Sequence, residues 1–240
     1  MAEELPLIHT SRCEHLAAIA ATHTLEPREC TVFSESLTYL FYGRPAYRSR
    51  VGSQFGEPIA LCPVCFVFKP RTVSRTLHRV FPCDTGAVAS DRFAPEIPAS
   101  DLAALELAPE IESARRAVSL FFEHNGAYFA GRVMAGRSFV GGSVAARFYD
   151  LLQRPGPADY DDRKSAIEVQ VNQAVPLSGQ LLFVVLPKEF LEEAPVRDAI
   201  INIWNCDPVT YPTFHGDAPA AYYAVVRQEV AKRFTEATRI

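Results

Sequence analysis

Short apolar runs along the chain have the length and composition of β-strands. Residues 7–10 and 30–33 are brief candidates, and residues 59–68 form the strongest buried-strand pattern of the first half. Residues 166–171 alternate, with apolar residues on one face and Glu and Gln on the other, and residues 180–186 are almost continuously apolar. The pattern therefore predicts strands near both ends of the chain.

Other segments repeat apolar residues every three or four positions, as an amphipathic helix does. Ser34 and Ser36 are candidate caps of a helical turn over residues 37–42. In a mostly helical middle, Asp101 is a candidate N-cap and Gly126 a candidate stop. The longer predicted helices cover residues 14–21, 101–107, 109–124, 194–204 and 218–234.

Strands at both ends with helices between them predict an α+β (mixed α/β) fold class. The 240 residues fit one domain, residues 1–240, with a mainly helical insertion at about residues 84–150. No apolar run approaches the ~18 residues that a membrane helix needs. The first four residues, MAEE, lack the basic start and apolar run of a secretory signal. We therefore expect a soluble, cytoplasmic protein with no membrane partner.

The charge balance limits the kind of nucleic-acid binding that is expected. The chain has 28 acidic and 24 basic residues and a formal net charge of -4, which argues against attachment to nucleic acid by bulk positive charge. Basic residues gather at 44–50 and 69–79, whereas acidic residues gather at 159–162 and 189–193. Any binding to nucleic acid must therefore use a local basic surface.

The cysteines are expected to be free, buried thiols, because the chain carries six of them without an export signal. Cys62, Cys65, His78 and Cys83 have a spacing near that of a small zinc site. However, Cys62 and Cys65 lie in a predicted strand, where residues three apart point to opposite faces. No metal ligand is assigned, and a small zinc-stabilised interaction domain stays as an alternative.

Two segments of the first half carry side chains suited to a nucleotide. His9, Thr10 and Ser11 end the first strand, and their imidazole and hydroxyls can bond a sugar or phosphate, or simply cap the following helix. In the segment LFYGRPAYR, Pro45 restricts Arg44 to an extended backbone. The aromatic residues of this segment offer stacking surfaces, and the arginine can bind an anion with two hydrogen bonds. A turn with aromatic residues in the core is the alternative interpretation of the same segment.

Glu168 is the third candidate for chemistry. A carboxyl group between β-branched neighbours in a strand is costly if it is buried without partners. If its face is exposed to solvent, the alternation is that of an ordinary half-buried strand. If its face lines a cleft, Glu168 can stabilise positive charge or accept a proton.

The order of these features resembles the ADP-ribosyltransferase fold, and within it the DarT-like group. The similar features are a strand ending in His9-Thr10, a helix with Leu16 and Ile19, an aromatic segment with Arg44 before proline, and a late strand carrying Glu168 before Val175-Pro176. The resemblance covers residues 7–50 and 160–187. It implies a split β-sheet core with helical insertions, and NAD as co-substrate.

The resemblance also implies roles for the residues that match. Glu168 and Arg44 would be catalytic, Glu168 by stabilising the ribosyl cation and Arg44 by holding the pyrophosphate or the nicotinamide ribose. The NAD-binding residues would be His9, Thr10, Ser11, Phe41, Tyr42 and Tyr47. Gln170, which shares the face of Glu168, and Arg163, from the loop before that strand, would bind the acceptor substrate.

The implied activity is transfer of ADP-ribose to an acceptor macromolecule such as DNA or RNA, as in a toxin or phage-defence protein that is paired with an antitoxin. Two other functions stay open at this point. A NAD glycohydrolase would use water in place of the acceptor, and a non-catalytic regulatory protein would bind the nucleotide without cleaving it. The sequence leaves the acceptor and the oligomeric state undetermined.

Overall fold

The computed structural model describes residues 4–46, 59–73, 76–155 and 162–238. The chain divides into two compact units, and each is described by itself. The first unit comprises Met1–Leu5, Pro27–Arg44 and Val73–Gln173, and the second Pro6–Glu26, Pro45–Thr72 and Ala174–Ile240. Each unit is assembled from segments that are distant in sequence, so long-range contacts hold it together.

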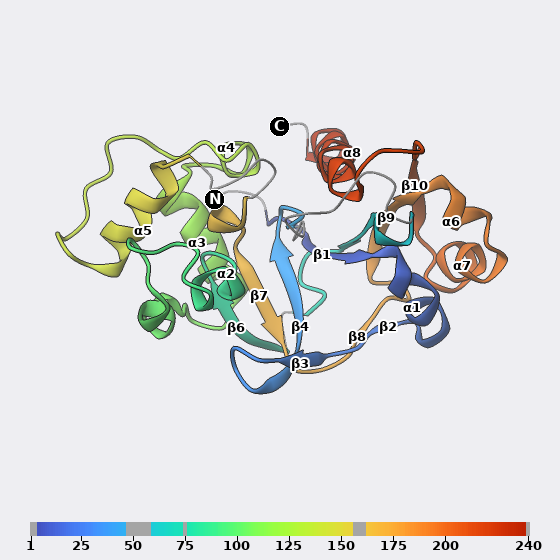
Figure 1. Ribbon diagram of the computed structural model, residues 1–240, viewed down its shortest axis with the longest axis horizontal. Coiled ribbons are helices and arrows are strands. Elements are labelled where there is room, and N and C mark those ends of the chain that lie inside the picture. The colour runs from blue at the N-terminus through green and yellow to red at the C-terminus, as the bar shows by residue number, and fades with distance from the viewer. Residues whose placement is uncertain (1–3, 47–58, 74–75, 156–161, 239–240) are drawn as a thin grey trace. The chain divides into compact units, whose positions relative to one another are not determined.

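The first unit contains antiparallel strands in the order β4-β7-β6, and β3 pairs with the beginning of β4 outside this order (Figure 1). Its strands are β3 (Arg28–Cys30), β4 (Glu35–Tyr42), β6 (Leu77–Phe81) and β7 (Glu168–Val171). Its α-helices are α2 (Thr85–Ala89), α3 (Ile111–Phe121), α4 (Asn125–Phe129) and α5 (Val144–Gln153), with 3-10 turns at Ala99–Leu105 and Arg163–Ser165.

The second unit contains a mixed sheet with the order β10-β9-β5-β1 and a small antiparallel pair, β2-β8. Its strands are β1 (Leu7–Arg12), β2 (Thr24–Leu25), β5 (Pro63–Phe68), β8 (Val175–Pro176), β9 (Leu181–Pro187) and β10 (Asp207–Tyr211). Its helices are α1 (Leu16–Thr22), α6 (Lys188–Glu192), α7 (Ala194–Asp198) and α8 (Tyr222–Thr238), with 3-10 turns at Cys13–His15, Ile59–Leu61 and Pro219–Ala221 and a π-helical turn at Ala199–Ile203. Only β10 and β9 run parallel among these described pairings.

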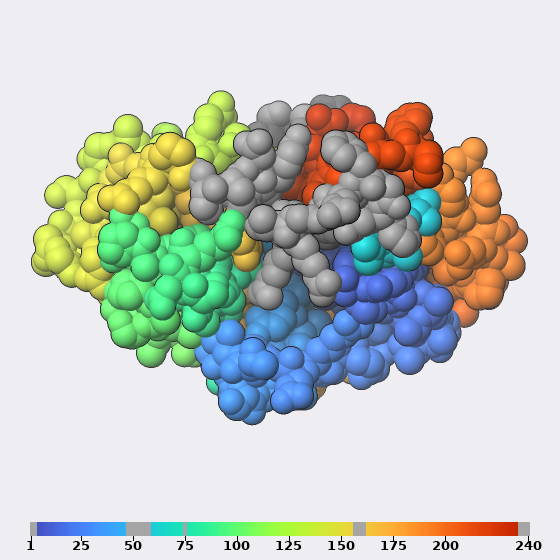
Figure 2. All heavy atoms as spheres, viewed as in Figure 1, coloured from blue at the N-terminus to red at the C-terminus, as the bar shows by residue number. Residues whose placement is uncertain are grey.

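The helices of the first unit follow from amphipathic spacing and capping. On α3 the buried residues Ile111, Ala114, Val118 and Phe121 recur every three or four positions. On α5 the Ser143 hydroxyl caps the helix by accepting a hydrogen bond from the N–H of Ala146 at 3.1 Å. Figure 2 shows green to yellow atoms of the helical part of this unit on the face turned toward the viewer.

One side chain of the helical insertion joins two strands of the first unit. The hydroxyl of Tyr128, from α4, donates to the carbonyl oxygen of Tyr42 at 2.7 Å and accepts from the N–H of Ile167 at 3.2 Å. Tyr42 is the last residue of β4, and Ile167 directly precedes β7. Tyr128 is fully buried, so its hydroxyl fixes the point at which the Glu168 strand begins.

The α+β class is confirmed, but the prediction of a helical turn over residues 37–42 is wrong, because these residues belong to β4. Both faces of β4 carry buried side chains, which removes the alternation that marks a strand. The aromatic residues of the segment favour the strand. The predicted strand at residues 30–33 is also wrong, since β3 ends at Cys30 and a turn with Ser34 at φ 54° follows.

Several predicted helix ends differ from the structure. Gly126 lies inside α4, and the chain turns after α3 at Glu123, whose φ is 72°. Asp101 lies inside a 3-10 turn. The structure adds β6, β10 and α5, which the pattern did not predict. Among the described residues, no helix combines the length and the apolar character needed to cross a membrane.

Candidate functional site

Glu168 is the first residue of β7, between β4 on one side and β6 on the other. It is paired with Phe41 of β4 and with Phe81 of β6. Because residues directly opposite one another in an antiparallel sheet share a face, two aromatic side chains flank the carboxyl group. Glu168 is 0% exposed. The interpretation of residues 166–171 as an ordinary half-buried strand with Glu168 in solvent is therefore excluded. A buried carboxyl group needs hydrogen-bond partners.

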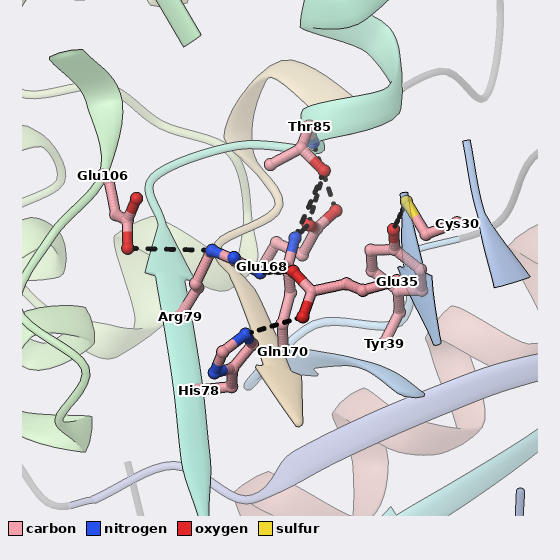
Figure 3. A network of polar contacts seen from close by, with 9 residues as sticks. All are labelled: Cys30, Glu35, Tyr39, His78, Arg79, Thr85, Glu106, Glu168 and Gln170. Atoms are coloured by element: carbon pink, nitrogen blue, oxygen red, sulfur yellow. Dashed lines mark hydrogen bonds and ion pairs between the residues drawn. The ribbon is translucent and has the colours of Figure 1, made fainter. Parts of the chain in front are cut away.

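Three donors surround the Glu168 carboxyl group (Figure 3). Oε1 accepts hydrogen bonds from the Thr85 hydroxyl and from the Gln170 side-chain amide, each at 2.7 Å, and Oε2 accepts one from the backbone N–H of Thr85 at 3.1 Å. A carboxylate oxygen accepts about two hydrogen bonds. Among the described residues, Oε1 therefore accepts two hydrogen bonds and is saturated. Oε2 accepts one and can accept a second.

The turn between β6 and α2 delivers Thr85 to this position. Asp84 caps α2, since its Oδ1 accepts from the N–H of Ala87 at 2.7 Å. The N–H of Asp84 donates to the carbonyl of Arg163 at 3.1 Å, which joins this turn to the one that precedes β7. The helix cap by Asp84 and its hydrogen bond to Arg163 hold the turn so that the Thr85 N–H and hydroxyl point toward Glu168.

The environment of Glu168 raises its pKa. Burial disfavours the charged form and is the largest cause, and the negative charge of Asp84 adds to it, whereas the hydrogen bonds from Gln170 and Thr85 oppose it. The result is a pKa of about 7. A carboxyl group that titrates near neutrality can both stabilise a cation and accept a proton.

Replacing Glu168 by glutamine should change the pH dependence of stability. A raised pKa in the folded state means that stability is greatest below the ordinary pKa of 4.5 and is lost as the pH rises through about 7. Between these limits the wild type should lose up to roughly 3 kcal/mol relative to Glu168→Gln. Urea unfolding at several pH values measures this, with Glu192→Gln at an exposed position as control. Parallel pH curves for Glu168→Gln and wild type would contradict the prediction.

Gln170 continues the polar face of β7 toward the surface. It pairs with Tyr39 of β4 and with Arg79 of β6 and is itself 0% exposed. Its side-chain carbonyl accepts from Nη1 of Arg79 at 3.5 Å. Arg79 in turn is ion-paired with Glu35, whose second oxygen lies 3.0 Å from Nε2 of His78 (Figure 3). Both ends of the Gln170 amide are therefore occupied by protein groups.

Arg44 is buried in a separate cluster of the first unit. Its Nη2 lies 2.7 Å from Oδ2 of Asp162, and its Nη1 donates to the Ser165 hydroxyl at 2.8 Å and to the Tyr128 carbonyl at 3.1 Å. The residue is 1% exposed. The guanidinium group therefore holds the turn that leads into β7.

The aromatic residues of the LFYGRPAYR segment are differently placed. Tyr42 is fully buried, and its hydroxyl accepts from the N–H of Leu5 at 3.0 Å. Phe41 is 8% exposed and stands beside Glu168. Tyr47 lies outside the described residues. Of the three candidates for ring stacking, the structure thus brings Phe41 to the carboxyl group.

The remaining predicted residues lie on β1 and before β7. His9, Thr10 and Ser11 pair with Phe66, Cys65 and Val64 of β5 and are partly exposed. They belong to the second unit, whereas Glu168 and Arg44 belong to the first. Arg163 opens the 3-10 turn before β7, and its carbonyl accepts from Asp84 as described above.

The described residues contain no group of three or more His, Cys, Asp or Glu side chains that could hold a metal ion. Cys62 and Cys65 belong to the second unit and His78 and Cys83 to the first. Burial raises the pKa of Cys65 to about 12 and that of Cys62 to about 11. Such thiols are uncharged at neutral pH and pack as small apolar groups.

Sequence reasoning missed the residues that support Glu168, namely Asp84, Thr85, Arg79 and Glu35. For two of them a signal exists, because Asp84-Thr85 follows the apolar pair Val80-Phe81 and can be interpreted as a strand followed by a helix cap. For Arg79 and Glu35 no local signal exists. Their proximity to Gln170 depends on the pairing of β6 with β7 and on the length of β4.

No protein-family model and no curated protein matches the chain. Among solved structures, the chain is similar to Thermus sp. 2.9 DarT in complex with carba-NAD+, with a TM-score of 0.44 and 10% identity over 88% of this chain and 97% of that chain. It is also similar to Thermus sp. 2.9 DarT in complex with ADP-ribosylated ssDNA, with a TM-score of 0.43 and 9% identity over 88% of this chain and 98% of that chain. At these identities the similarity assigns no role to any residue.

Proposed function

We propose that the protein is a NAD-dependent ADP-ribosyltransferase in which Glu168 is the catalytic carboxylate. The observation that carries the proposal is a buried carboxyl group with three protein donors and a raised pKa, whose Oε2 has an acceptor position that none of the described residues fills. The motif resemblance to the DarT-like group supports the choice of NAD. The unused position fits a hydroxyl donor such as that of a ribose.

The chemistry expected of Glu168 follows from charge. NAD supplies a glycosidic bond whose electron pair leaves with neutral nicotinamide, so that positive charge develops on the ribosyl carbon. The Glu168 carboxylate stabilises this charge through a ribose hydroxyl, from which it accepts a hydrogen bond. The same carboxylate then takes the proton of the nucleophile that bonds to the ribosyl carbon. Thr85 and Gln170 hold the carboxylate in place for both roles.

Other residues are assigned by the resemblance and by their surroundings. We assign His9, Thr10 and Ser11 to the hydroxyls and amide of NAD and, among the aromatic residues, Phe41 to its nicotinamide ring. Tyr42 and Arg44 are occupied by protein partners. We therefore assign them to holding β4 and the turn before β7 in place. Arg163 remains our candidate for contact with the acceptor.

The acceptor in this proposal is a nucleic acid, DNA or RNA. The motif resemblance supports this choice, and a toxin or phage-defence role with a paired antitoxin rests on the same resemblance. The near-neutral charge of the chain requires that the contact be local.

The proposal is tested by incubating the full chain with NAD labelled in its adenosine part, first alone and then with cell lysate. Transfer is shown by label on macromolecules, and nuclease- or protease-treated samples identify the acceptor class. Loss of NAD with no labelled macromolecule would show a glycohydrolase. Calorimetric binding of NAD without release of nicotinamide would show a non-catalytic binding protein and overturn the proposal.

A further inference from the structure

The Gln170 side chain is held at both ends, in opposite directions. Nε2 donates to Oε1 of Glu168 at 2.7 Å, and the carbonyl oxygen accepts from Nη1 of Arg79 at 3.5 Å. A primary amide can rotate by half a turn and exchange these ends, so its partners decide which end faces the carboxyl group. Arginine has donors only. Arg79 therefore holds the carbonyl outward and leaves the amino group for Glu168.

Arg79 is itself fixed in place. Its Nη1 forms an ion pair with Oε1 of Glu35, and its Nε lies 3.9 Å from Oε1 of Glu106. Its guanidinium carbon lies 4.6 Å from the centre of the Phe33 ring. Arg79 therefore contacts two carboxyl groups and one aromatic ring. A guanidinium group stays charged throughout the accessible pH range, so its effect on Gln170 persists when Glu168 gains or loses its proton.

We infer that Arg79 is a positioning residue for Glu168, acting through the Gln170 amide. This inference rests on the proposed function, since it gives Arg79 the task of keeping the catalytic carboxylate supplied with a donor. Arg79 itself lies at the partly exposed end of the network, where its side chain is 21% exposed, whereas Glu168 is 0% exposed. The network therefore connects the buried carboxyl group to a charge near the surface (Figure 3).

Loss of Arg79 removes the donor that fixes the orientation of the Gln170 amide. Without a donor at its outer end, the Gln170 amide is free to turn its carbonyl toward Glu168. Two acceptors then face each other unless the carboxyl group holds a proton, and the protonated form is favoured. Because one charged hydrogen bond is exchanged for a repulsive contact, we expect the pKa of Glu168 to rise by about one unit.

Other groups near Glu168 do not account for such a change. On the β6–α2 connection, the charged form of Asp84 raises the pKa of Glu168, while Thr85 lowers it by hydrogen bonding. Cys83 lies in the same connection and is uncharged, because burial raises its pKa well above the ordinary value. On β4 and β6, the directly paired residues are the uncharged Phe41 and Phe81. None of these groups is altered by substitution of Arg79.

The test compares Arg79→Met, which removes every donor, with Arg79→Lys, which keeps a charge and a donor. Arg115→Met is the matched control, because Arg115 is also largely buried and pairs with Glu112 on α3. Two readouts are made on the full chain. The first is the pH profile of NAD consumption, and the second is the titration of side-chain carboxyl groups by 13C NMR, in which Glu168→Gln identifies the signal of Glu168.

For Arg79→Met we expect both midpoints to move about one unit toward alkaline pH, with about tenfold lower activity at pH values below the wild-type midpoint. Arg79→Lys should restore part of the shift, and Arg115→Met should show none. An unchanged Glu168 titration in Arg79→Met and Arg79→Lys would overturn the inference. If the wild type consumes no NAD, the proposed function fails, and the NMR titration still decides whether Arg79 controls Glu168.

Discussion

Glu168→Gln is expected to lower the release of nicotinamide from NAD by at least ~100-fold, because it removes the negative charge that stabilises the ribosyl cation. Glutamine has nearly the same shape and keeps one acceptor oxygen, which can serve the Thr85 hydroxyl and the Gln170 amide, whereas its amino group cannot accept from the Thr85 N–H. It cannot neutralise a cation or take the proton of the nucleophile. The loss should therefore appear in the rate of the chemical step more than in the affinity for NAD.

Nicotinamide release, measured by mass analysis after incubation with NAD, tests this expectation. Near-ultraviolet circular dichroism and urea unfolding establish that the variant is folded, and calorimetry measures whether NAD still binds. The exposed Glu192 on α6 provides the control, because Glu192→Gln removes an exposed carboxylate of the second unit, whereas Glu168 belongs to the first. A Glu168→Gln protein that keeps more than a tenth of the wild-type rate would show that Glu168 is not the catalytic carboxylate.

Asp162→Asn is expected to destabilise the fold by about 3 kcal/mol, because it leaves the Arg44 guanidinium buried without a countercharge. The two side chains are 2% and 14% exposed and lie 2.7 Å apart. Ser165 and the Tyr128 carbonyl remain as partners of Arg44, but neither carries a charge. Since the pair fixes the turn before β7, the loss should reach the position of Glu168 as well.

Urea unfolding measures this effect as a lower midpoint with an unchanged slope. The comparison is Glu110→Gln, which breaks the Arg116–Glu110 pair, whose side chains are 59% and 54% exposed. Exposed pairs contribute about 0.2–1 kcal/mol, so the control should change stability by a small amount. A loss below about 1 kcal/mol in Asp162→Asn would show that Arg44 obtains its compensation elsewhere.

The predictable part of the fold consists of segments whose pattern is unambiguous. β5 and β9 are continuous apolar runs, and α3 has regular helical spacing, so each was found with ends shifted by a few residues. β4 was mistaken for a helical turn because a short apolar run buried on both faces has no period to distinguish the two. β6 was missed because His78 and Arg79 interrupt its apolar residues at a bulge.

The candidate site divides in the same way. Glu168 stood out because a carboxyl group among β-branched residues demands a partner. Its partners could not be predicted, because Thr85 comes from the turn after β6 and meets Glu168 only through long-range strand pairing. The burial of Arg44 could not be predicted from the sequence either. The sequence shows an arginine before proline, whereas its partner Asp162 lies more than a hundred residues away.

The hydroxyl of Tyr128 has a consequence for engineering. The segment around α4 supplies two hydrogen bonds that, with the direct bond from the Tyr42 N–H to the Ile167 carbonyl, join the end of β4 to the residue before β7. A segment that contributes a hydrogen-bonding side chain to two strands cannot be exchanged independently of them. Chimeras that exchange the helical region between homologous scaffolds therefore need to carry this tyrosine, together with Tyr42 and Ile167, as one inseparable set.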